Sequence, residues 1–216
     1  DDGPAPDHAR VAAIRDALRG PDGPLLVFTG RLVPEKGAAD LLDAVAMLAK
    51  TLPGVRAAII GDGPERPALE RQSHALGIGR RVRFTGWLAP PDVRAHLHAA
   101  DIFVGPSRPA PDGWVEAQGL VFVEAMLAGV PVIASAIGGV RDAVRDGETG
   151  LLVPPAAPAA IADAVLRIAG DPGLAHRLAK GGQQLARAEF TRTTSASRFA
   201  ELYARLAAGG ETRRNT

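Results

Sequence analysis

The 216-residue chain carries 25 basic and 24 acidic side chains, a formal net charge of +1, and is 46% hydrophobic. This balance argues against a general nucleic-acid-binding surface but allows a local phosphate site. Without cysteine, disulfides and thiolate metal sites are excluded. No apolar run reaches the roughly 20 residues that a membrane span needs, and the first residues lack the layout of a signal peptide. We therefore expect a cytoplasmic protein.

The pattern of apolar residues predicts one domain over residues 7–208. A linker rich in Pro, Gly and Asp is expected over residues 1–6, and a disordered polar tail over residues 209–216. Continuous apolar runs or strand-like residues bounded by turn formers predict six strands, at 25–29, 55–60, 82–86, 101–104, 130–134 and 151–153. Helical spacing predicts helices at 8–18, 38–52, 64–76, 90–99, 120–128, 138–144, 158–169, 172–189 and 193–207.

Strands that alternate with helices predict an α/β fold of the Rossmann-like, doubly wound type, with a mostly parallel six-stranded sheet and helices on both faces. Ligands of such sheets bind beyond the carboxyl ends of the strands. The loops expected there contain the residues most suited to ligand binding, namely Gly30, Arg31, Lys36, Gly61, Gly63, Leu88 and Glu116. We expect these loops to share one edge of the sheet.

Two glutamates bracket the start of the helix expected at 120–128. Glu116 lies in a preceding loop rich in proline and glycine, and Gly119 stands directly before the apolar helical pattern that begins at Leu120. Glu124 falls inside this pattern, so we expect a buried carboxylate that needs a partner. The segment Gly138-Gly139 is interpreted as the entry to the next helix.

Together these residues resemble the retaining, nucleotide-sugar-dependent glycosyltransferases of the GT-B fold, known as glycosyl transferases group 1, and specifically their C-terminal, donor-binding domain. The motifs that carry the resemblance are TGRLVPEKG at 29–37, GDGP at 61–64, RFTG at 83–86, DIFVGPS at 101–107, the glutamates at 116 and 124, and DGETGLLV at 146–153. They extend over nearly the whole chain, and their combination is specific although each alone is weak.

The resemblance implies roles for individual residues. Arg31 and Lys36 would hold the donor diphosphate and take the place of a metal, because two cations can neutralise the charge on the departing nucleotide. Glu124 would bind the ribose hydroxyls, Glu116 would lie near the donor sugar, and Leu88 would contact the nucleobase through its backbone. Backbone N–H groups of Gly119, Leu120 and Val121 would add positive charge toward the sugar and phosphates.

The resemblance also implies that a preceding acceptor-binding domain is needed, through which the whole protein could contact a membrane peripherally. No cofactor is implied beyond the nucleotide-sugar substrate. Many family members have glycine and an aromatic residue where Ala117-Gln118 stands here, which leaves the choice of sugar open. The predicted function is transfer of a hexose to a carbohydrate or lipid acceptor, in cell-envelope or exopolysaccharide synthesis.

Other interpretations remain at this point. The chain could be a non-catalytic module that binds a nucleotide sugar, or belong to a nucleotide-sugar epimerase of the same fold. Asp62 is interpreted as a turn former, because no second carboxylate or histidine accompanies it. His96 and His98 are two residues apart on an expected helix and point away from each other, so no metal site is assigned.

Overall fold

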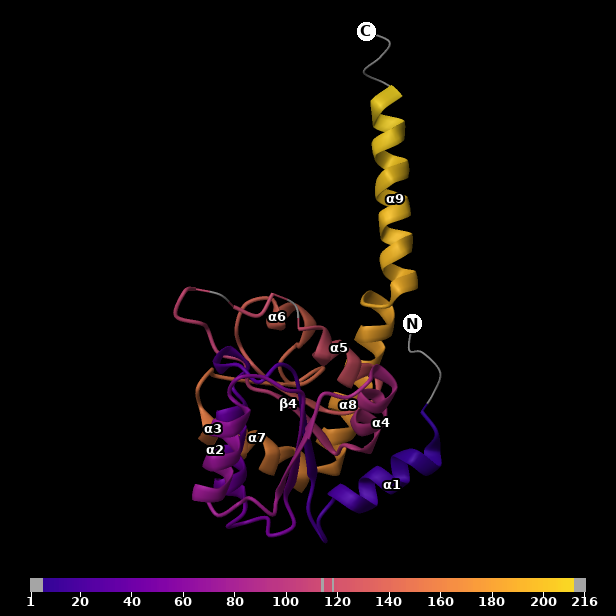
Figure 1. Ribbon diagram of the computed structural model, residues 1–216. Coiled ribbons are helices and arrows are strands. Elements are labelled where there is room, and N and C mark those ends of the chain that lie inside the picture. Colours follow the sequence, from indigo (N-terminus) through magenta and orange to yellow (C-terminus); the bar gives the residue numbers. More distant parts are fainter. Residues whose placement is uncertain (1–5, 114, 118, 212–216) are drawn as a thin grey trace.

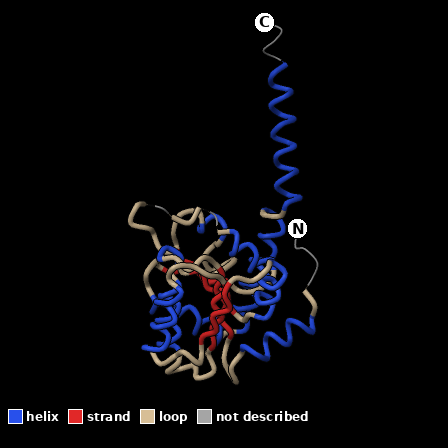
Figure 2. The backbone as a smooth tube through the Cα atoms, viewed as in Figure 1, coloured by secondary structure: helices blue, strands red, loops and turns tan. Residues whose placement is uncertain are grey.

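The computed structural model describes residues 6–113, 115–117 and 119–211. These residues form a six-stranded sheet flanked by helices (Figures 1 and 2). The strands are β1 (Leu25–Thr29), β2 (Arg56–Ile60), β3 (Val82–Gly86), β4 (Ile102–Gly105), β5 (Val132–Ser135) and β6 (Leu151–Val153). All neighbouring strands pair in parallel, in the order β3-β2-β1-β4-β5-β6. The predicted doubly wound fold is confirmed.

Two hydrophobic clusters sandwich the sheet, because successive residues of a strand point to opposite faces. Leu26 and Phe28 of β1 join one cluster, while Leu25 and Val27 join the other, and all four are at most 2% exposed. Helices α2 (Ala38–Leu48), α3 (Arg66–Ala75) and α7 (Pro158–Gly170) cover the first face. Helices α1 (His8–Leu18), α4 (Pro90–Ala99), α5 (Leu120–Leu127) and α6 (Val140–Ala143) cover the second, and α8 (Pro172–Glu189) contributes to both clusters. Burial of each large apolar side chain stabilises the fold by about 1.5–3 kcal/mol.

The strand order reverses its direction of growth between β1 and β4. From β1 the chain builds outward through β2 to β3, then returns to the other side of β1 for β4, β5 and β6. At such a switch point the loops that follow the two central strands diverge to opposite faces and leave a crevice. The loops after β1 and β4 therefore mark where a ligand should bind.

Helix α9 (Arg192–Glu211) projects away from the body of the domain, shown in yellow in Figure 1. Helix α9 ends at Glu211, so the rest of the tail expected over residues 209–216 lies outside the described residues, as do residues 1–5 of the expected linker. Phe199, Tyr203 and Leu206 are 59%, 66% and 63% exposed, although their spacing places them on one side of the helix. Of the helices described, none has the length and apolar character to cross a membrane.

Candidate functional site

A groove of about 640 Å³ opens between the loops that follow β1 and β4, at the switch point of the sheet. Its lining residues are Arg31, Val33, Glu35, Lys36, Ala110, Pro111 and Asp112. The structure thus brings Arg31 and Lys36 to one groove, as the sequence predicts. Arg31 is exposed, and the part of the chain that is described offers it no ion-pair partner. The groove therefore holds two cations, Arg31 and Lys36, together with the carboxylates of Glu35 and Asp112.

The two loops that border the groove are in direct backbone contact. The 3₁₀ turn η1 (Pro34–Lys36) ends at Gly37, whose φ of 68° lies in the left-handed region. A Cβ atom at Gly37 would lie 1.9 Å from the carbonyl oxygen of Pro106. The backbone N–H of Arg108 donates to the carbonyl of Glu35 at 2.8 Å. Glycine is thus required at position 37 both by conformation and by the approach of the second loop.

An ion pair with a buried carboxylate fastens the loop after β4 to helix α2. The guanidinium of Arg108 donates two hydrogen bonds to the carboxylate of Asp40, which is 1% exposed. These bonds raise the pKa of Arg108 above its usual range. Sequence reasoning missed this pair, although Asp40 stands among the buried apolar residues Ala38 and Leu41. A carboxylate on the buried face of a helix requires a partner, which was the available signal.

Lys36 forms an ion pair with Glu116, whose side chain is 10% exposed. The Glu116 segment is held from behind, because its carbonyl oxygen accepts a hydrogen bond from Gly139 N at 3.1 Å. A Cβ atom at Gly138 would lie 2.3 Å from that oxygen, so the Gly138-Gly139 pair does more than open α6. Glu116 is therefore a fixed, shielded carboxylate that holds the ammonium of Lys36 at the groove.

Gly119 caps the amino end of α5 with a φ of 63°, and a Cβ atom there would lie 2.4 Å from the ring of Phe122. Leu120, the first residue of the helix, is 65% exposed although the apolar pattern begins there. Val121 is half-buried. The expected contribution of the amides of these three residues to ligand binding stays a prediction. Gln118, part of the departure from the family pattern, lies outside the described residues.

The prediction that Glu124 is buried was wrong, because its side chain is exposed on α5. It lies one turn after Leu120 and shares that residue's open face, while Phe122 and Val123 carry the helix into the core. Partial desolvation by its surroundings still raises the pKa of Glu124, and the positive charge of Arg94 opposes this shift. The Glu124 carboxylate is available to a ligand because it is exposed, and not because it is a buried charge without a partner.

The loop after β2 packs against the loop after β1. A Cβ atom at Gly61 would lie 1.9 Å from the carbonyl oxygen of Gly30, and one at Gly63 would lie 2.4 Å from that of Leu32. Leu32 N in turn donates to the carbonyl of Asp62 at 3.0 Å. These glycines therefore allow close backbone contact beneath Arg31, a structural reason for their presence beside any role toward a ligand.

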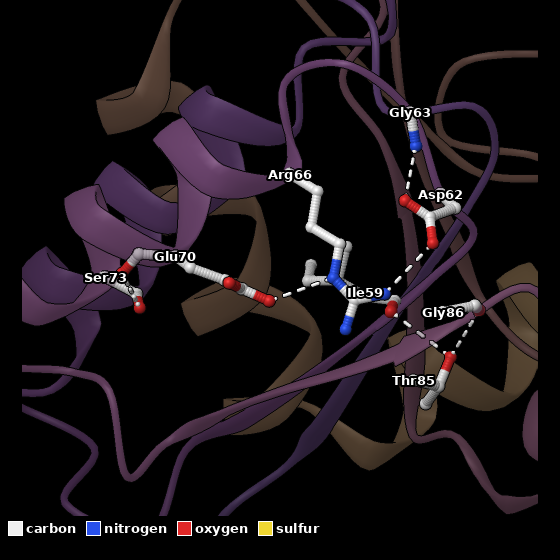
Figure 3. Close-up of polar contacts among 8 residues, drawn as sticks. All are labelled: Ile59, Asp62, Gly63, Arg66, Glu70, Ser73, Thr85 and Gly86. Atoms are coloured by element: carbon white, nitrogen blue, oxygen red, sulfur yellow. Dashed lines mark hydrogen bonds and ion pairs between the residues drawn. The ribbon is translucent and has the colours of Figure 1, made fainter.

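Figure 3 shows that Asp62 closes its own turn, as predicted for this residue. Its carboxylate accepts from Gly63 N at 2.8 Å and from the guanidinium of Arg66 at 3.1 Å, and Arg66 also binds Glu70 at 2.9 Å. In the described part of the chain, no group of three or more His, Asp or Glu residues could hold a metal ion.

Leu88 follows β3 and is half-buried against the cluster on the α4 face. It lines a separate, mainly apolar groove between α1, α4 and the β3 edge, and not the groove that contains Arg31 and Lys36. The structure therefore separates Leu88 from the two cations, and its predicted contact with a nucleobase stays a prediction.

The family model of glycosyl transferases group 1 matches residues 12–185. The chain belongs to this family. The match includes β1 to β6 and both loops that border the groove.

Curated relatives are about a third identical to this chain over the aligned residues. A GDP-mannose-dependent alpha-(1-6)-phosphatidylinositol monomannoside mannosyltransferase of Mycobacterium tuberculosis is 35% identical over 197 residues, which cover 91% of this chain and 51% of the relative. A glycogen synthase of the same organism is 36% identical, with 92% of this chain and 49% of the relative covered. The chain thus spans about half the length of these relatives.

Solved structures of glycosyltransferases superimpose on this chain over about half of their length or over an isolated C-terminal domain. HepE of Anabaena, in complex with UDP-glucose, superimposes with a TM-score of 0.81 at 30% identity, over 92% of this chain and 53% of that one. The C-terminal domain of the group 1 glycosyl transferase LpcC of Francisella tularensis gives a TM-score of 0.73 at 25% identity and is covered over 95% of its length. The fold is therefore the C-terminal half of a GT-B fold.

Proposed function

We propose that this chain is the donor-binding half of a retaining glycosyltransferase, which transfers a hexose from a nucleoside-diphosphate sugar to a carbohydrate or lipid acceptor. The observation that carries this proposal is the groove at the switch point, where Arg31 and Lys36 face an open space large enough for a diphosphate. The UDP-glucose complex of HepE, a structural neighbour, supports this class of donor.

In this proposal Arg31 and Lys36 stabilise the negative charge that develops on the departing diphosphate, without a metal or cofactor. Glu116 orients Lys36 before the donor arrives and then lies beside the donor sugar. Glu124 and the backbone of Leu88 bind the nucleoside, and the amides of Gly119, Leu120 and Val121 face the sugar and phosphates. The departing phosphate takes the proton of the acceptor hydroxyl on the same face of the sugar, so no protein base is assigned.

The acceptor site belongs to a further domain in this proposal, since the chain spans about half of its relatives. The exposed apolar side chains Phe199, Tyr203 and Leu206 of α9 offer a surface to which such a domain could bind. We therefore expect the isolated chain to bind donor and to transfer no sugar. The names of the relatives favour a role in cell-envelope or polysaccharide synthesis. The proposal places the enzyme in the cytoplasm, with any membrane contact made through the acceptor domain.

The test is calorimetric titration of the chain with UDP, GDP and ADP. Lys36→Ala should weaken binding of the preferred nucleotide by about tenfold to a hundredfold, the value of one charge-assisted hydrogen bond. Lys180→Ala is the matched control, because Lys180 is exposed on α8 and away from the groove. Binding of no nucleotide, or equal binding by both variants, would remove the basis for a donor site here.

Glu116→Gln separates two roles of that carboxylate. Because Glu116 neutralises Lys36 in this structure, its removal should leave or increase affinity for the free nucleoside diphosphate. Affinity for the nucleotide sugar should fall relative to the nucleotide, since Glu116 is expected beside the sugar. A parallel loss of both affinities would show that Glu116 acts only by shaping the groove.

A further inference from the structure

A second groove lies at the other end of the sheet, and we call it the arginine groove. Its volume is about 730 Å³, and it is formed by the end of α1, the turn that follows it, the start of β2 and the segment that enters β3. Its lining residues are Ala17, Leu18, Arg19, Gly20, Pro21, Arg56, Ala57, Gly79, Arg80, Arg81, Val82 and Arg83. Arginine is the most frequent residue of this lining, and no carboxylate belongs to it.

The arginine groove is separate from the candidate donor site. Arg56 and Val82 are the first residues of β2 and β3, whereas Arg31 and Lys36 follow the carboxyl end of β1. The five residues of β2 span roughly 15 Å at the usual rise of a strand. The two grooves therefore open at opposite ends of a parallel sheet, and a ligand of one does not occupy the other.

The positive charge of the arginine groove is mostly uncompensated. Arg19 contacts Asp101 at 3.2 Å, but within the described residues no carboxylate forms an ion pair with Arg56, Arg80, Arg81 or Arg83. Arg66, Arg108 and Arg145, which lie outside this groove, each pair with a carboxylate. A chain with a net charge of only +1 thus gathers unpaired guanidinium groups in one concave place.

Backbone contacts hold several of these guanidinium groups in place. Arg56 donates to the carbonyl of Val55 at 3.0 Å, Arg19 donates to that of Gly23 at 3.1 Å, and Arg81 donates to that of Pro53. Each guanidinium has five N–H donors, so most remain available. A Cβ atom at Gly20 would lie 3.0 Å from Cζ of Arg56, so a glycine there leaves room for that guanidinium.

We propose that the arginine groove binds two or more phosphate groups, either on one soluble molecule or on neighbouring lipid headgroups. Guanidinium groups match the geometry of phosphate oxygens with paired hydrogen bonds, and several of them without carboxylate partners favour a multiply charged anion. The groove is of the size that holds a small ligand. The site is independent of the donor site, because it shares no residue with that groove.

The test uses the chain with Arg31→Ala and Lys36→Ala, which removes phosphate binding at the candidate donor site. The result is then the same whether or not the proposed function is correct. Inorganic pyrophosphate is titrated by calorimetry, and vesicles of phosphatidylglycerol are used in sedimentation, with phosphatidylcholine vesicles as the neutral control. In this background Arg80→Ser with Arg83→Ser removes two exposed guanidinium groups that make no hydrogen bond or ion pair with the described residues, so the fold should remain intact.

We expect this double variant to bind at least about tenfold more weakly, the effect of losing even one charge-assisted hydrogen bond. Arg167→Ser with Arg205→Ser is the charge-matched control, because both side chains are exposed on α7 and α9, outside the arginine groove. Loss of pyrophosphate binding identifies a soluble ligand, and loss of vesicle binding alone identifies lipid headgroups. Absence of both kinds of binding, or equal losses in the two double variants, would overturn the proposal.

Discussion

Replacement of Arg108 by methionine should destabilise the fold by about 3 kcal/mol, because it leaves the carboxylate of Asp40 buried without its partner. The Asp40 side chain is 2% exposed, and Arg108 provides both of its hydrogen bonds. Loss of one partner of a buried pair costs about 3–5 kcal/mol. We take the lower end because the side chain of Arg108 is itself 36% exposed, so part of its charge is hydrated.

Urea unfolding followed by circular dichroism measures this free energy, and the melting temperature should fall by roughly 6–12 °C for a domain of this size. Arg66→Met is the control, since it breaks two exposed pairs at i,i+4 spacing and should cost at most about 1 kcal/mol. Asp40→Leu combined with Arg108→Met should recover most of the loss, because no unpaired charge remains. A cost below about 1 kcal/mol for Arg108→Met alone would refute the reasoning.

Two further predictions concern stability. Gly37→Ala should lower the free energy of unfolding in urea more than Gly77→Ala does. Both glycines have left-handed φ values, 68° and 71°, but only at position 37 would the new Cβ meet a backbone oxygen, that of Pro106. Equal losses of stability in the two variants would contradict this reasoning. Burial, with a smaller effect of Arg10, lowers the pKa of His96 from 6.5, so the folded state binds its proton less readily than the unfolded state. The contribution of His96 to stability should therefore be full above pH 6.5 and fall as the pH drops below it. His96→Gln should reduce the difference between the urea midpoints measured at about pH 7.5 and 5.5. An unchanged difference would exclude His96 as a source of this pH dependence.

The sheet was accessible from the sequence because its strands are buried on both faces. The run from Leu25 to Thr29 is apolar almost throughout, and such a run is hard to satisfy except in the centre of a parallel sheet. The position of each loop relative to the sheet then follows, because a loop after a parallel strand must emerge at the carboxyl edge. Arg31 and Lys36 therefore lie after β1 at the predicted edge of the sheet, while their role toward a donor stays a prediction.

The sequence does not predict which side chains pair across long separations, nor which side of α5 faces the core. Arg108 and Asp40 are 68 positions apart, and no local pattern says which of several carboxylates an arginine after a strand will reach. The error at Glu124 has a different origin. An almost uninterrupted apolar helix carries little information about which side faces the core, so the open face shared by Leu120 and Glu124 depended on how α5 packs.

The contact between the loops after β1 and β4 should make the two loops move together when a ligand binds. Because Gly37 touches Pro106 and Glu35 is bonded to Arg108, neither loop can shift without carrying the other along. A ligand that draws Lys36 toward itself would also displace the strand-end segment leading to Glu116. Hydrogen exchange at Arg108 and at the amide of Lys36 should therefore slow together on ligand binding, with one shared opening event in place of two.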